Sequence, residues 1–140
     1  MDAAATYLDL PIPNRANHLW RYTPWHRIHP TGKTAYLPTT IAPPVIHLAM
    51  LDGSEPPDGV TISASEGVDG VAPVDDVAAA FIRALTAGDS VTLSVAKGVR
   101  LKQPLLLQVE VEGDVCGIHF NHDIGPRSEV ELITVFKGDA

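Results

Sequence analysis

Residues 91–111 read VTLSVAKGVRLKQPLLLQVEV, and this stretch decides the fold. Apolar and polar residues alternate before and after a Lys97-Gly98 turn, which is typical of half-buried strands joined by a tight turn. Further strands are expected at residues 115–124 and 130–136, each preceded by a glycine-containing turn. Because no helix interrupts this series, the pattern predicts a sandwich, a barrel or the coils of a β-solenoid.

Upstream of this series, the pattern predicts strands at residues 45–51 and 60–64 and one clear helix at residues 76–87. Val77, Phe81 and Leu85 recur every four residues and give the helix an apolar stripe. Asp75 or Asp76 is expected to cap its first turn, and Gly88 to end it. The first 44 residues predict a short helix at 3–9, a helical turn at 14–22 and an extended, proline-rich arm at 23–44.

The composition describes a domain-sized chain with an acidic body. The 140 residues are 45% hydrophobic and carry a net charge of −7. This charge argues against a general nucleic-acid or anionic-membrane surface, since both need a basic face. The first residues lack the basic and apolar regions of a secretory signal, and no window reaches the roughly 20 apolar residues of a membrane span. We therefore expect a cytoplasmic protein.

The segment Trp20 to Arg27 holds both tryptophans of the chain and two arginines. Alternating aromatic and arginine side chains can bind single-stranded nucleic acid by stacking. They can equally anchor an arm, with tryptophan buried and arginine paired with carboxylates. Because residues 34–140 carry fifteen acidic and six basic side chains, we favour anchoring.

The only cluster of metal-ligand residue types in the second half is Cys116, His119 and His122. On a strand over 115–124, Cys116 and His119 would face opposite sides, and Cys116 and His122 would lie roughly 20 Å apart. One chain alone is thus not expected to hold an ion with them. Cys116 is then a small buried residue, and His119 pairs with Asp123 on a solvated face. The alternative is a metal site that these residues complete with another chain.

The sequence contains no phosphate-binding, nucleophile-elbow or zinc-protease motif. The strand expected at 130–136 ends close to the last residue of the sequence. An edge strand presents N–H and C=O groups that can pair with another chain. Either a partner or a second copy covers it, or Lys137 and Asp139 protect it.

Three stretches in order resemble the SufB/SufD family of iron–sulfur cluster assembly proteins, and the SufD branch especially. The N-terminal residues Leu10-Pro11 and Leu19-Trp20-Arg21-Tyr22-Thr23-Pro24 are similar to the family's "LP…WRYT" signature. Residues 75–87 followed by 91–105 resemble its helix and its entry into a β-solenoid. Residues 129–138 resemble one of its early solenoid strands.

The resemblance implies a mainly β fold with a helical N-terminal arm, one internal helix and the first coils of a right-handed parallel β-helix. It divides the chain into an arm (1–44), a mixed strand-helix region (45–89) and a solenoid start (90–140). It implies a non-catalytic scaffold protein with a SufB-like subunit and a SufC-like ATPase as partners, or self-association through the C-terminal edge strand. No intrinsic cofactor is expected, and an iron–sulfur cluster is expected only in a complex. The alternative function is a small metal-binding protein using Cys116, His119 and His122 at an oligomer interface.

Overall fold

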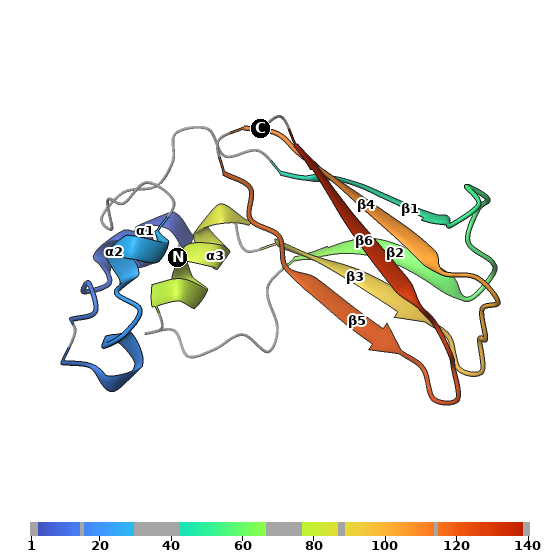
Figure 1. The fold of residues 1–140 in the computed structure, drawn as a ribbon, viewed down its shortest axis with the longest axis horizontal. Coiled ribbons are helices and arrows are strands. Elements are labelled where there is room, and N and C mark those ends of the chain that lie inside the picture. The colour runs from blue at the N-terminus through green and yellow to red at the C-terminus, as the bar shows by residue number, and fades with distance from the viewer. Residues whose placement is uncertain are drawn as a thin grey trace.

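The computed structural model describes residues 3–14, 16–29, 43–66, 77–86, 89–113 and 115–138. Over these ranges the chain is mainly β, with a few short helices lying beside two sheets (Figure 1). The expected mainly β class is thus confirmed. The strands are β1 (Val45–Met50), β2 (Val60–Glu66), β3 (Asp89–Val95), β4 (Leu105–Val111), β5 (Phe120–Ile124) and β6 (Leu132–Gly138). The helical elements are α1 (Ala3–Asp9), η1 (His18–Trp20), α2 (Trp25–Ile28) and α3 (Val77–Leu85).

Each sheet has three strands and mixed direction. One has the order β1-β4-β6 and the other β2-β3-β5. The first strand of each is antiparallel to the middle strand, and the last strand is parallel to it. The chain therefore passes through both sheets three times. We call these passages the first rung (β1 and β2), the middle rung (β3 and β4) and the third rung (β5 and β6).

The main hydrophobic core lies between the two sheets and is built from rows of side chains, one from each rung. The register places Leu48, Leu107 and Thr134 side by side, because paired residues share a face of the sheet. The middle rung is the most deeply buried, since Leu107 is 1% exposed and Val109 fully buried. This is why Leu105, Leu107, Val109 and Val111 form an apolar face of β4.

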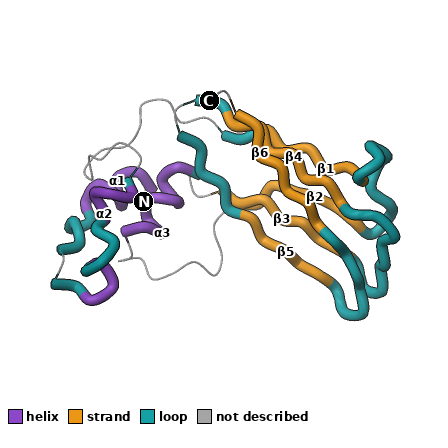
Figure 2. The backbone as a smooth tube through the Cα atoms, in the orientation of Figure 1, coloured by secondary structure: helices purple, strands orange, loops and turns teal. Residues whose placement is uncertain are grey.

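The helices lie together beside the sheets (Figure 2), and a second hydrophobic core joins them. Phe81 of α3 packs against Tyr7 of α1 and Trp25 of α2, with ring centroids 5.2 and 5.5 Å apart. Burial raises the pKa of the Tyr7 hydroxyl. Trp25 is buried, as anchoring requires, whereas Arg21 and Arg27 are exposed.

In the described part of the arm, residues 25–28 form a helical turn and not the expected extended chain. Pro24 precedes the turn with an extended backbone and accepts a hydrogen bond from the Arg27 N–H (2.9 Å). A proline at a helix start loses no intrahelical hydrogen bond, and burial of Trp25 stabilises the turn. The expected helix caps Asp75, Asp76 and Gly88 lie outside the described residues.

The exposed Asp52 carboxylate links the turn after β1 to the segment before β4. It accepts hydrogen bonds from the Ser54 N–H (2.9 Å), the Ser54 hydroxyl (2.6 Å) and the Gln103 Nε2 (3.0 Å). The bonds from Ser54 and then Gln103 lower the pKa of Asp52 from 3.8 to about 2. A carboxyl whose pKa falls on folding stabilises the fold above its unfolded pKa and loses that effect as the pH falls through its folded pKa.

We therefore expect Asp52→Asn to lower the urea midpoint at neutral pH, and the gap to wild type to shrink as the pH falls from 4 towards 2. Urea unfolding followed by circular dichroism at both ends of this pH range measures the gap. The control is Asp58→Asn, an exposed aspartate of the same loop. A gap that stays constant with pH would contradict the role of the charge.

Candidate protein interface

The third rung forms one edge of both sheets (Figure 1). Within the part of the chain that the structure describes, β5 pairs only with β3 and β6 only with β4. Because both pairs are parallel and in register, the inward side chains of this rung continue the rows of the main core. They are Phe120, His122 and Ile124 of β5, and Leu132, Thr134 and Phe136 of β6.

Two of these inward side chains, Phe136 and Ile124, are exposed, although the residues that pair with them on the middle rung are buried. Phe136 is 62% exposed beside the fully buried Val109, and Ile124 is 45% exposed beside Val95, which is 3% exposed. The first rung differs, because its Val60, in the same row as Ile124, is only 7% exposed. In this row the core is thus covered at the first rung and open at the third.

The backbone of the third rung is also available for pairing. The Leu105 N–H donates to the Glu131 carbonyl (2.8 Å), and the Val91 N–H donates to the His119 carbonyl (2.9 Å). In a parallel ladder every second residue of a strand bonds to the neighbouring strand, and the residues in between direct their N–H and C=O groups the other way. Glu131 and His119 belong to the bonded sets of β6 and β5. The main chain of Thr134 and of His122 therefore faces the open edge. Such groups are a template for an added strand.

Lys137, one of the two side chains expected to protect this edge, leaves its inward row uncovered. Lys137 follows Phe136 along β6, so it lies on the opposite face of the sheet, beside its register partner Glu110. Asp139 lies outside the described residues. The open surface therefore combines exposed apolar side chains with a free strand edge.

The structure separates the three proposed metal ligands by their environments. His122 lies on β5, is exposed and stacks on Phe120, with ring centroids 6.4 Å apart. His119 is half-buried, and its Nε2 lies 3.1 Å from the Asn121 Oδ1, so it contacts Asn121 and not the expected Asp123. Cys116 is half-buried, and burial raises the pKa of its thiol, which disfavours the thiolate that binds metals.

The strand expected at residues 115–124 begins only at Phe120. The preceding segment leaves the sheet and runs past α3 (Figure 2). Val115 packs on the helical core, and a Cβ on Gly117 would lie 2.4 Å from the Leu85 Cβ. The contact with α3 therefore displaces this segment from the sheet, and the strand alternation assumed for Cys116 and His119 does not hold.

Among the described residues no three His, Cys, Asp or Glu side chains are grouped so that they could share a metal ion. A site completed by another chain stays a prediction. The alternation in the sequence predicted that residues 120, 122 and 124 share one face of a strand, and these residues do form the inward face of β5. The openness of the third rung, and a contact between His119, Asn121 and Ser90, depend on the spatial pairing of β3 with β5 and were not predicted.

Comparison with known proteins found no matching family model, curated protein or solved structure. Within the described ranges, no helix has the length and apolar character that crossing a bilayer requires.

Proposed function

We propose that this chain is a non-catalytic, SufD-like component of iron–sulfur cluster assembly that acts through protein–protein interaction. The proposal joins the "LP…WRYT"-like N-terminal segment and the ordered motifs that follow it to the open third rung. The single observation that carries the interaction is the exposure of Phe136 and Ile124 in rows whose neighbours are buried. Exposed apolar side chains beside a free strand edge favour association with another chain.

We further propose that the middle and third rungs are the first coils of a right-handed parallel β-helix. Three observations support this assignment. Val91 pairs in parallel with Phe120, 29 residues later, and Leu105 pairs in parallel with Leu132, 27 residues later. A parallel bridge between Arg100 and Glu129 continues the same pairing through the corner. A nearly constant repeat in two sheets is typical of a solenoid, and crossovers between parallel strands are almost always right-handed.

In this proposal the partner is a SufB-like subunit that covers the third rung, in a complex with a SufC-like ATPase. An added strand would hydrogen-bond to the backbone of β6 or β5, and its side chains would bury Phe136 and Ile124. The chain supplies a surface and no catalytic group, and a cluster would be cargo of the assembled complex. Self-association through β6 is the competing outcome.

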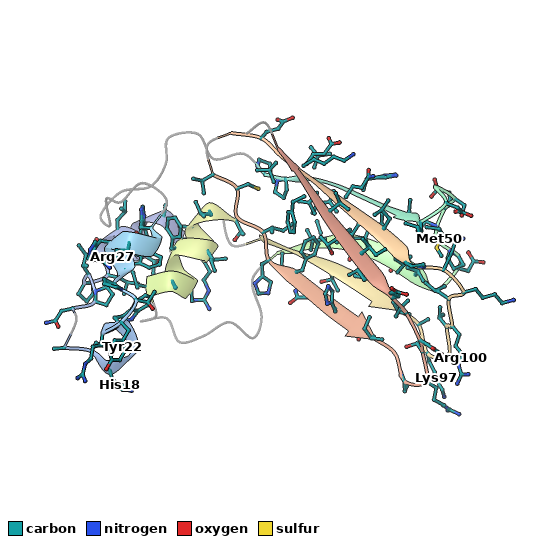
Figure 3. All side chains as sticks on the ribbon, in the orientation of Figure 1. His18, Tyr22, Arg27, Met50, Lys97 and Arg100 are labelled. Carbon is teal, nitrogen blue, oxygen red and sulfur yellow. The ribbon has the colours of Figure 1, made fainter. Side chains whose placement is uncertain are left out.

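The test is co-expression of the tagged chain with the SufB-like and SufC-like proteins of the same genome, followed by affinity capture. Phe136→Asp places a charge in the open row and is expected to weaken capture at least about tenfold, the size of a moderate interface hot spot. Tyr22→Asp is the matched control, because Tyr22 is also an exposed aromatic residue (82%) but lies among the helices (Figure 3). We expect the control to leave capture unchanged.

Light scattering of the isolated chain distinguishes the competing outcome. A dimer that Phe136→Asp dissociates, without capture of either partner, would assign the surface to self-association. A monomer that captures neither protein would overturn the proposed function.

A further inference from the structure

A cavity of about 600 Å³ lies between the helices and the nearby ends of the two sheets. Its walls come from α1, α3, the first two rungs and the segment before β5. The apolar wall residues include Ile46, Ala64, Leu85, Val91 and Ile118. A mostly apolar concave space of this size is typical of a small-molecule site.

A short chain of polar side chains reaches this cavity. Ser90 and His119 both line it, and Asn121 connects them. The Asn121 Nδ2 donates to the Ser90 hydroxyl (3.3 Å), and the Asn121 Oδ1 lies 3.1 Å from the His119 Nε2. In the tautomer that matches this contact, the Nε2 donates to the Asn121 Oδ1 and the Nδ1 is left as an acceptor.

The charge of the lining restricts the ligand. Among the described residues that line the cavity, none is Asp, Glu, Lys or Arg. A charged ligand would lose its hydration here without a counter-charge, which is costly. A neutral molecule avoids that cost, and a hydroxyl group on it would match the acceptor of His119.

We propose that this cavity binds a neutral, mostly apolar small molecule with one hydroxyl group, such as a medium-chain alcohol. The apolar part of the ligand occupies the space beside Ala64 and Leu85, and its hydroxyl donates to His119. Asn121 and Ser90 hold the imidazole in the accepting tautomer. The site uses none of the open positions of the third rung, so it stands independently of the proposed partner.

The test is calorimetric titration of the full chain with decanol and with its methyl ether, which lacks the donor. Wild type is expected to bind the alcohol about tenfold more tightly than the ether, the effect of one hydrogen bond. His119→Leu is expected to abolish this preference while it keeps the binding of the ether. The ratio of the two affinities reports on the hydroxyl contact even if the variant changes overall stability.

A second pair of variants tests the location. Ala64→Leu fills part of the cavity and is expected to weaken binding of both compounds about tenfold. Ser63→Leu is the control, because Ser63 is the exposed neighbour on the opposite face of β2 and is expected to leave binding unchanged. No binding of the alcohol by wild type, equal effects of the two variants, or a preference that survives His119→Leu would overturn the proposal.

Discussion

Replacing Gly125 with alanine is expected to lower the free energy of unfolding by about 3 kcal/mol, the upper range for an overpacked site. Gly125 directly follows β5 and donates its N–H to the Val95 carbonyl (2.8 Å). A Cβ at this position would lie 2.5 Å from the Lys97 nitrogen and 2.8 Å from the Ala96 carbonyl carbon. These are backbone atoms, so the two corners would have to separate, and the parallel pairing of β3 with β5 would be strained.

Gly98, in the corner of the middle rung, provides a matched control. It has a φ of +76°, but a Cβ there would meet nothing within 4 Å. Gly98→Ala is therefore expected to cost only the backbone term, about 1 kcal/mol. Chemical denaturation of both variants measures the difference. A larger loss for Gly98→Ala than for Gly125→Ala would contradict the close approach of the two corners.

The second large effect is expected for Leu107→Ala, which should lower the free energy of unfolding by about 3 kcal/mol. Leu107 is 1% exposed and lies in the middle of its row, between Leu48 and Thr134. Removal of the Leu107 side chain leaves a cavity, and the first and third rungs would both have to move to fill it. Thr134→Ala, in the same row of the third rung, is expected to change the stability by less than about 0.5 kcal/mol because Thr134 is exposed.

Urea unfolding of the two variants compares the middle and third rungs directly. Similar losses would mean that the third rung is as well covered as the middle rung, and the proposed interface would lose its basis. The comparison thus tests the openness of the core without any partner protein.

The local elements were predictable where the pattern is carried by neighbouring residues. The spacing of Val77, Phe81 and Leu85 predicts α3, and the alternation around Leu107 predicts β4. The helical turn at Trp25 was missed, because the surrounding prolines indicate extended chain. Its stabilisation comes from contacts with Phe81, which is more than 50 residues away in the sequence.

The candidate sites were harder to predict. Alternation shows which side chains share one face of a strand, but it does not show which other strand pairs with it. Nothing local says that β6 lies parallel to β4, so the row of Val109 and Phe136 was not visible in the sequence. Likewise Ser90 and Asn121 are brought together by the pairing of β3 with β5. The segment around Cys116 was predicted to be a strand from its local pattern. The contact of Gly117 with Leu85 of α3, which keeps this segment out of the sheet, joins residues far apart in the sequence and could not be predicted.

The antiparallel first rung has a consequence for the order of folding during synthesis. Val45 of β1 pairs with Glu110 of β4, so the pairing spans 65 residues of chain. When β1 leaves the ribosome, the strand that it will join has not yet been translated. Contacts so distant in the sequence slow folding, and waiting strands are prone to aggregate. We therefore expect the nascent chain to need chaperone protection until residue 111 has emerged.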